Sequence, residues 1–281
     1  MESLEEKLIQ DKRITPEQLA LARKEAKRLG KSFWVALAKL GILSQEDIAI
    51  FFAQESGIPY VRISDYQITD EVIRLVDEDF CRQNLVIPLF KINNTLFVAC
   101  VNPLDTTVVD SLLSKTGFDI EPLIASPYSI SQAQDYCYGL EDRLFNLERF
   151  VLKQGAMRSL PFSRASERIP LKVPVWLCVE DKRLVLKYSS PIEGTTRDIS
   201  SEGTAVGLNI LLFIPKGAMV MLEFKSTKGS SFKSAIKTKG EVVYCRMEEG
   251  LRYFLGIRFI DIEDPVRREL LKLAEQKQAS G

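Results

Sequence analysis

"AIKTKGEVVYCR" at residues 235–246 and "RYFLGIRFI" at residues 252–260 decide the fold of the C-terminal half. Both are short runs rich in valine, isoleucine and aromatic residues, which pack well on a pleated sheet. Gly, Pro, Ser and Lys separate similar runs ahead of them: "LKVPVWLCV" (171–179), "RLVLKYS" (183–189), "TAVGLNIL" (204–211) and "AMVMLEFK" (218–225). Many short strands divided by turn residues predict a small antiparallel barrel. We expect "DPVRRELLKLAEQ" (264–276) to close it with a terminal helix.

The first sixty residues predict paired helices, because one apolar pattern occurs twice at an offset of 29 residues. In each copy a hydroxyl residue, Thr15 or Ser44, stands before an acidic first turn and apolar residues at helical spacing. That order is a helix N-cap signature. Lys12 stands where the second copy has Gly41. We expect each unit to form a short helix, a turn and a longer amphipathic helix.

Residues 59–138 predict a small α/β unit. "NLVIPLFKINNTLFVACVNP" (84–103) holds two β-rich runs around Asn93-Asn94, as in a hairpin. A helix that ends at Gly117 follows, then a strand near "IEPLIAS" (120–126) and a closing helix in "SISQAQDYCYG" (129–139). The predicted fold class is therefore α+β with several domains: N-terminal helical hairpins with a small α/β unit, and a C-terminal antiparallel β-barrel with a terminal helix.

The segment between the two halves has a helical pattern of its own. Leu140, Leu144, Leu147 and Val151 recur at the spacing of an amphipathic helix. Such a helix either packs on its own domain or pairs with a second copy as a short coil. We predict three parts: an N-terminal domain at 1–138, a linker helix and joint at 139–160, and the barrel domain at 161–281.

Composition argues against several kinds of enzyme. The chain has no histidine, which excludes Ser-His-Asp and Cys-His catalysis and His-ligated zinc. "KGSSFKS" (228–234) has too few residues between its glycine and lysine for a phosphate-binding loop. The five cysteines form no Cys-x-x-Cys pair, so we expect reduced thiols and no metal site. Catalysis by a carboxylate or a lysine stays open on composition, but we predict a protein without catalytic residues.

Hydropathy and charge narrow the possible partners. The longest apolar run, "LNILLFIP" (208–215), is too short to span a bilayer, and the acidic start "MESLEEKLIQ" does not resemble a secretory signal. We expect a cytoplasmic protein without direct membrane insertion. Residues 1–155 hold 17 basic and 23 acidic residues, whereas residues 156–281 hold 21 and 15. An anionic ligand would thus prefer the C-terminal half, where basic residues outnumber acidic ones. This excess of basic residues is smaller than we expect for a nucleic-acid-binding barrel.

Two short motifs in the C-terminal half suit an anionic ligand. Arg164 and Arg168 stand four apart before the first barrel strand, and guanidinium groups offer planar donor forks to phosphate or guanine. Asp-x-Ser-x-x-Gly stands at a strand end and turn at one edge of the predicted barrel, where the Asp198 carboxylate is suited to accept hydrogen bonds from N1 and N2 of guanine. Ser200 points from the same edge of the predicted barrel as Asp198. Gly203 lets the turn fold tightly and lets a ligand approach the backbone. Each motif alone is also common as a solvated surface or an ordinary turn.

The combination resembles the PilZ domain over about residues 161–278. "GEVVYCR" (240–246) matches a late strand of that family, and "GIRF" (256–259) its end. The resemblance implies a receptor for the bacterial second messenger cyclic di-GMP, with no other cofactor. It implies that Arg164 and Arg168 clamp phosphate and guanine, that Asp198 and Ser200 read the guanine edge, and that Gly203 is a backbone requirement. We add Arg197 as a further residue that contacts the ligand. This choice rests only on its positive charge beside the motif and not on the family.

Residues 1–138 resemble the N-terminal domain of type II secretion and type IV pilus assembly ATPases. "GIPYVRI" (57–63), "TLFVACVNPLD" (95–105) and "TGFDIEPLIAS" (116–126) carry this resemblance. In that family the domain docks the ATPase onto its membrane platform, and some versions bind cyclic di-GMP through repeats led by Arg-Leu-Gly. Here "SFW" (32–34) stands at the lead-in position. The resemblance therefore implies a protein-docking module.

These observations favour a non-enzymatic cyclic di-GMP receptor. In this hypothesis the ligand clamps the arginine loop onto the barrel and reorients the N-terminal interaction domain, which signals to secretion, pilus, motility or biofilm machinery. One ligand or a stacked pair is compatible with the motifs. The alternative is an interaction adaptor of pilus or secretion assembly in which nucleotide binding is incidental or absent.

Overall fold

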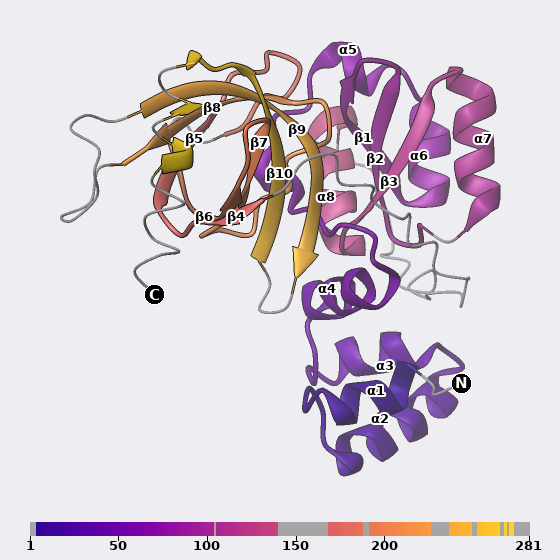
Figure 1. The fold of residues 1–281 in the computed structure, drawn as a ribbon. Helices are drawn as coiled ribbons and strands as arrows, with labels where there is room; N and C mark the ends of the chain where they lie inside the picture. The colour runs from indigo at the N-terminus through magenta and orange to yellow at the C-terminus, as the bar shows by residue number, and fades with distance from the viewer. Residues whose placement is uncertain are drawn as a thin grey trace.

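The computed structural model describes residues 4–103, 105–139, 168–187, 191–225, 236–248, 252–264, 267–268 and 270–272. Figure 1 shows an N-terminal helical lobe, a small α/β unit and a barrel packed beside that unit. The predicted α+β fold class is confirmed. Arg164 and the linker pattern at 140–160 lie outside the described residues. Within the described ranges, no helix has the length and apolar character needed to cross a membrane.

The helical lobe contains the predicted repeat. Thr15 and Ser44 each accept a hydrogen bond from a backbone amide in the first turn of the following helix, in a capping box. Lys12 has φ 54°, and Gly41, its equivalent, has φ 66°, so both copies turn through the left-handed region. The lobe consists of α1 (Leu4–Gln10), α2 (Pro16–Leu29), α3 (Phe33–Lys39) and α4 (Gln45–Ser56).

The "SFW" segment contributes to the core of this lobe. Ser32 caps α3, and Phe33 and Trp34 are buried. The Trp34 ring lies 4.7 Å from that of Phe52 in an edge-on arrangement, which adds to the stability of a buried aromatic pair. These side chains therefore join α3 to α4.

The α/β unit is built around a three-stranded sheet in the order β1-β2-β3. Asn93-Asn94 forms the hairpin between β1 and β2, as predicted, and β3 runs parallel to β2. Side chains of β2 alternate: Leu96 and Val98 face α5, α6 and α7, whereas Phe97 joins the larger core on the other face. The elements are η1 (Ile63–Asp65), α5 (Asp70–Ile73), α6 (Glu78–Asn84), β1 (Val86–Ile92), β2 (Thr95–Cys100), α7 (Thr106–Thr116), β3 (Asp119–Ile124) and α8 (Pro127–Tyr138).

The C-terminal half forms the predicted antiparallel barrel. Its strands follow the order β6-β5-β8-β9-β10-β7, and pairing of β6 with β7 closes the sheet. The described residues between 264 and 272 are helical, as predicted, and Leu270 is buried. The strands are β4 (Ile169–Pro170), which adds to β6, and β5 (Pro174–Val179), β6 (Ile192–Ile199), β7 (Gly203–Leu208), β8 (Met219–Phe224), β9 (Ile236–Glu248) and β10 (Arg252–Asp261).

One predicted strand is wrong. In "RLVLKYS", the described residues 183–187 form a turn with a single bridge from Leu186 to Tyr66 of the α/β unit. The barrel instead uses "IEGTTRDI" (192–199) as β6, which sequence analysis treated only as a strand end and turn. Leu184 is buried and Leu186 packs against the shared core, so these apolar residues serve a contact between the halves rather than the barrel ladder.

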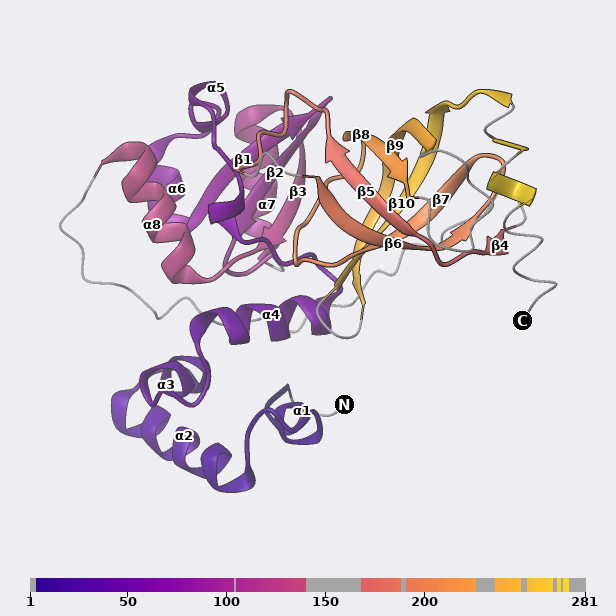
Figure 2. The same cartoon turned by 90° about the vertical axis from the view of Figure 1, so that its left-hand side faces the viewer.

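The two halves share a buried junction. The Phe213 ring lies 6.3 Å from that of Phe97 in the α/β unit and 5.9 Å from that of Tyr253 in the barrel. The Tyr253 hydroxyl donates to the Tyr60 carbonyl, and the Tyr66 hydroxyl donates to the Phe213 carbonyl. Each half thus supplies a phenol that satisfies the backbone of the other. Figure 2 shows the barrel and the three-stranded sheet side by side.

Tyr253→Phe should lower the free energy of unfolding by about 1–2 kcal/mol at pH 7, because the buried Tyr60 carbonyl loses its donor. Urea denaturation measures this change. Tyr136→Phe is the matched control, since the Tyr136 side chain is 88% exposed and should leave stability unchanged. Equal stability of the two variants would contradict the role of the Tyr253 hydroxyl.

The same phenol should make the protein sensitive to alkali. Burial raises the pKa of Tyr253 well above its ordinary value of 10.0, so the folded protein keeps this proton while the unfolded chain loses it. The stabilisation is therefore complete below pH 10 and is lost as pH rises above it, at about 1.4 kcal/mol per pH unit. Tyr253→Phe should show a slope smaller by about that amount in urea denaturation between pH 10 and 11. An unchanged slope would be evidence against this ionisation.

Candidate ligand-binding site

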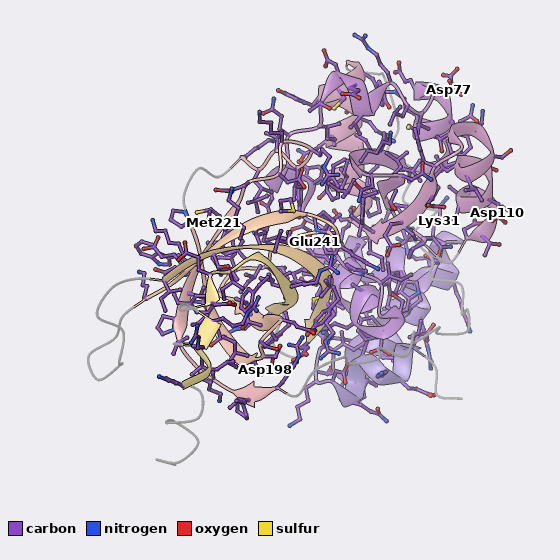
Figure 3. The ribbon with its side chains drawn as sticks, turned by 45° about the horizontal axis from the view of Figure 1, so that its top comes forward. Lys31, Asp77, Asp110, Asp198, Met221 and Glu241 are labelled. Carbon is purple, nitrogen blue, oxygen red and sulfur yellow. The ribbon has the colours of Figure 1, made fainter. Side chains whose placement is uncertain are left out.

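The pairing of β4 with β6 brings Arg168 and Asp198 into contact. Arg168 directly precedes β4, and the register aligns Pro170 with Asp198. Nη1 of Arg168 donates to Oδ1 of Asp198 at 2.6 Å, and the two side chains are 23% and 18% exposed. Asp198 lies on the barrel, apart from Asp77 and Asp110 of the α/β unit (Figure 3). The structure thus joins one residue of each predicted motif at a solvent-accessible edge of the barrel.

Arg197 occupies an irregular position in β6. The register with β7 shifts between Thr196 and Asp198, so Arg197 is the extra residue of a β-bulge, a device that redirects a side chain. Its Nη1 donates to Glu248 at 3.0 Å, and its Nε lies 3.6 Å from Asp198. Its guanidinium group also lies 5.2 Å from the ring centroid of Phe254. Arg197 therefore stands beside the Arg168–Asp198 pair, and its contact with a ligand stays a prediction.

Ser200 differs from the expectation that its side chain points outward. The residue is 3% exposed. Its hydroxyl oxygen accepts from the backbone amides of Glu202 and Gly203 at 3.3 and 3.2 Å, and it contacts the Gly203 carbonyl. Ser200 therefore holds the turn between β6 and β7, which is the common role of serine in such a motif.

Gly203 is required for a different reason than sequence analysis gave. A Cβ at this position would lie 2.1 Å from the carbonyl oxygen of Ile257 in β10, so a larger residue would clash with backbone. Its φ is not positive. The glycine therefore allows β7 and β10 to approach each other, and this packing accounts for it without a ligand.

Sequence analysis missed the neighbours on β9 and β10. Arg246 pairs with Glu248 at 2.7 Å and lies 5.5 Å from the ring centroid of Tyr244. The Tyr244 ring covers Gly256, where a Cβ would lie 2.1 Å from it. Tyr244, Arg246 and Glu248 alternate along β9, so the two-residue period of a strand could have placed them on one face.

These residues form what we call the rim cluster: Arg168, Arg197, Asp198, Tyr244, Arg246, Glu248 and Phe254. Guanidinium groups donate to anionic oxygens, carboxylates accept from ring N–H groups, and aromatic rings or guanidinium planes stack on a planar ligand. In the part of the chain that the structure describes, no three Cys, Asp or Glu side chains gather in a way that could hold a metal ion. The rim cluster is equipped to bind a planar anion.

Two family models match the chain. The MshEN domain model matches residues 56–144, and the PilZ domain model matches residues 162–276. The chain combines an MshEN domain with a PilZ domain. The PilZ match contains the barrel and the rim cluster, and the MshEN match contains the three-stranded sheet and α8. Both predicted resemblances are confirmed, while the domain boundaries at 138 and 161 stay predictions.

Curated relatives match the N-terminal half of this MshEN–PilZ protein. The type IV pilus assembly ATPase PilB of Myxococcus xanthus is 30% identical over 135 residues, which are 48% of this chain and 24% of that protein. PilB of Thermus thermophilus is 30% identical over 111 residues, which are 39% of this chain and 12% of that protein. The chain thus spans about a quarter of these relatives or less.

Solved structures are similar to each half separately. The structure of MshE with cdg is 23% identical and covers 49% of this chain and all of that one, with a TM-score of 0.43. The PilZ domain of YcgR from Escherichia coli with c-di-GMP is 14% identical and covers 42% of this chain and 95% of that one, with a TM-score of 0.32.

Gly203→Ala should destabilise the barrel by about 1–3 kcal/mol, because the added methyl group must displace the β10 backbone. Urea denaturation with an intrinsic fluorescence readout measures the loss. The neighbouring exposed Glu202→Ala is the control and should change stability by no more than about 0.5 kcal/mol. A Gly203→Ala protein as stable as this control would show that β7 does not need a glycine here.

Proposed function

We propose that this MshEN–PilZ protein is a non-enzymatic receptor for cyclic di-GMP, which binds at the rim cluster. The contact between Arg168 and Asp198 within a PilZ domain carries the proposal, because it unites a phosphate-binding cation with a guanine-reading carboxylate. The YcgR PilZ domain was solved with c-di-GMP. The absence of histidine from the whole sequence supports binding rather than catalysis.

Binding proceeds by exchange of partners. The N1 and N2 hydrogens of guanine donate to Asp198, and the released Arg168 guanidinium binds a phosphate oxygen. Separating a partly exposed ion pair costs about 0–1 kcal/mol, whereas each new charge-assisted hydrogen bond contributes about 1.5–3 kcal/mol. Three or four such bonds offset the cost of association and give micromolar affinity or better. Arg164, four residues before Arg168, supplies the second clamping guanidinium group in this proposal.

The other predicted site residues take distinct roles in the proposed complex. Arg197 presents a third guanidinium group from the bulge beside Asp198. Ser200 and Gly203 shape the turn that directs Asp198, and the Ser200 hydroxyl reaches a guanine edge by giving up its contact with the Gly203 carbonyl.

Arg168→Ala should abolish binding of cyclic di-GMP, with affinity at least about 100-fold weaker, which corresponds to about 2.7 kcal/mol. The loss follows because the released Arg168 guanidinium supplies the charge-assisted contact to phosphate in the proposed complex, and alanine has no donor to replace it. Isothermal titration calorimetry of the full chain measures it, with GTP as the competing guanine nucleotide.

Lys237→Ala provides the matched control for Arg168→Ala. It removes one positive charge from the barrel, where Lys237 pairs with Glu223 and is 64% exposed, outside the rim cluster. Binding should stay within about twofold of the parent. Unchanged affinity of Arg168→Ala for cyclic di-GMP would refute the rim cluster as the binding site. If the parent protein binds no cyclic di-GMP, the receptor hypothesis is wrong and the adaptor hypothesis is the one that remains.

The signal passes to residues 1–138, which we propose dock a protein partner in pilus or secretion machinery, as the PilB relatives suggest. Separation of the two halves would expose Phe213, Tyr253 and Tyr66 to water, at a cost of several kcal/mol. A ligand shifts an equilibrium by no more than its difference in affinity for the two states. The reorientation is therefore a small sliding movement of packed domains.

Cyclic di-GMP should change the hydrogen exchange of the junction segments 60–67 and 211–215, because a sliding movement strains their hydrogen bonds. Exchange measured by mass spectrometry with and without ligand gives the result, and Arg168→Ala should show no change. Ligand binding without any change at the junction would reject this signalling route and leave the binding site intact.

A further inference from the structure

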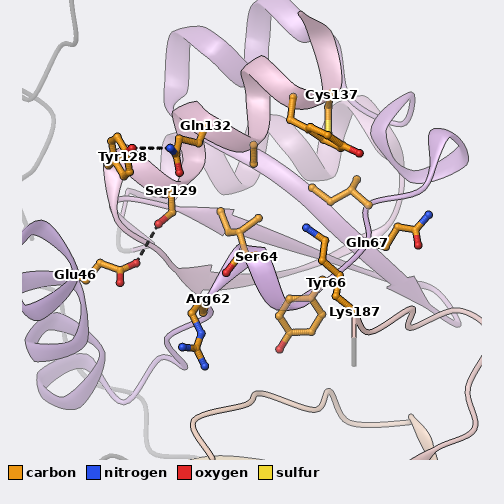
Figure 4. A pocket seen from close by; sticks show the side chains of 14 residues that line it. Glu46, Arg62, Ser64, Tyr66, Gln67, Tyr128, Ser129, Gln132, Cys137 and Lys187 are labelled. Atoms are coloured by element: carbon orange, nitrogen blue, oxygen red, sulfur yellow. Dashed lines mark hydrogen bonds between the residues drawn. The ribbon is translucent and has the colours of Figure 1, made fainter. Parts of the chain in front are cut away.

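A cavity of about 760 Å³ lies between η1 and α8, at the place where the barrel half meets the MshEN domain. Its volume falls within the usual range of ligand sites, and such sites are frequent at domain junctions. Figure 4 shows α8 along one side of the cavity and η1 along the other. The rim cluster contributes none of its lining residues.

Backbone contacts between the halves lie beside the cavity. Tyr66, in its floor, forms a bridge with Leu186, and the Gln67 amide donates to the Val185 carbonyl at 2.8 Å. The Lys187 amide donates to the Asp65 carbonyl at 3.0 Å. This pairing places Lys187, a residue of the C-terminal half, in the lining of a cavity otherwise formed by residues 46–137. The complete lining, with Lys187, therefore requires both halves of the protein.

The lining combines aromatic walls with a cation. Tyr128 and Tyr136 stand eight residues apart on α8 and are 51% and 88% exposed, and exposed aromatic side chains favour contact with a partner. The Lys187 side chain extends from the C-terminal half toward α8 (Figure 4). Its ammonium group acts on Cys137 of α8, where it opposes the rise that burial causes in the pKa of that thiol.

At the end of the cavity near Glu46 and Arg62, the acidic side chains already have hydrogen-bond donors. Glu46 Oε1 accepts from the hydroxyls of Tyr60 and Ser129, each at 3.1 Å. Arg62 pairs with the buried Asp65 at 3.0 Å. Two acidic side chains thus have neighbouring donors, and Lys187 adds a cation to the lining from the C-terminal half.

We propose that this cavity binds a small aromatic anion, with its ring system against the tyrosines of α8 and its negative group at Lys187. Such a ligand contacts α8 and Lys187 together, so it stabilises the junction between the MshEN and barrel halves. The site is separate from the rim cluster and does not depend on cyclic di-GMP binding there.

The probe for this site is 8-anilinonaphthalene-1-sulfonate, an aromatic sulfonate that fluoresces when shielded from water. Fluorescence titration of the full chain gives its affinity, and Lys187→Glu should weaken binding at least tenfold. Lys182→Glu makes the same charge change in the exposed turn outside the cavity and should stay within twofold. Arg168→Ala should bind the dye as the parent does, so failure of the receptor proposal would not affect this result.

Cys137 reports whether the dye occupies this cavity, because its thiol belongs to the lining. A saturating dye concentration should slow alkylation of Cys137 by iodoacetamide severalfold, as measured by peptide mass spectrometry, and leave exposed Cys178 unaffected. Dye binding without protection of Cys137, or equal affinity in Lys187→Glu and Lys182→Glu, would overturn the proposal. Equal protection by sodium sulfate would also overturn it, since the negative group alone would then suffice.

Discussion

Closure of the barrel through β7 is the constraint on which the C-terminal half depends. β7 pairs with β6 on one edge and with β10 on the other, which leaves no free edge there for another chain to extend. The close approach of β7 to β10 requires a residue without a side chain at position 203. Closure also fixes the end of β6, so that Asp198 meets Arg168, the residue directly before β4. A packing requirement thus sets the geometry of the rim cluster.

β10 connects the rim cluster to the junction. Neighbouring residues on a strand face opposite sides of the sheet, and here Phe254 lies beneath Arg197 while Tyr253 faces the Tyr60 carbonyl. A change at the rim and a change at the junction therefore act on adjacent residues of one strand. This short physical connection makes sliding of the two domains a reasonable response to a ligand at the rim.

Local signals in the sequence predicted the elements whose formation is local. The caps at Thr15 and Ser44 and the turn at Asn93-Asn94 depend on side chains within a few residues of each other. The order of the Asp-x-Ser-x-x-Gly and arginine motifs around the strands was enough to predict that Arg168 and Asp198 lie close together.

The features that sequence analysis failed to predict share one cause: each depends on contacts with residues far away in the sequence. "RLVLKYS" has a strand composition, but Leu186 contacts Tyr66 across the junction and not another barrel strand. The reason for Gly203 lies in β10, and the donor to the Tyr60 carbonyl is 193 residues away. Strand propensity depends on such tertiary contacts, and no periodicity in one sequence reports them.

The buried junction also has a consequence for assembly. The barrel packs through Phe213 on the face of the three-stranded sheet that carries Phe97, and α8 lies on the same face, so this contact surface is closed to any other protein. A protein that needs the same face would compete directly with the barrel, and the two could not occupy it at once. A protein that attaches while the barrel stays in place therefore has to use another surface, such as the α6–α7 side of the sheet or the helical lobe.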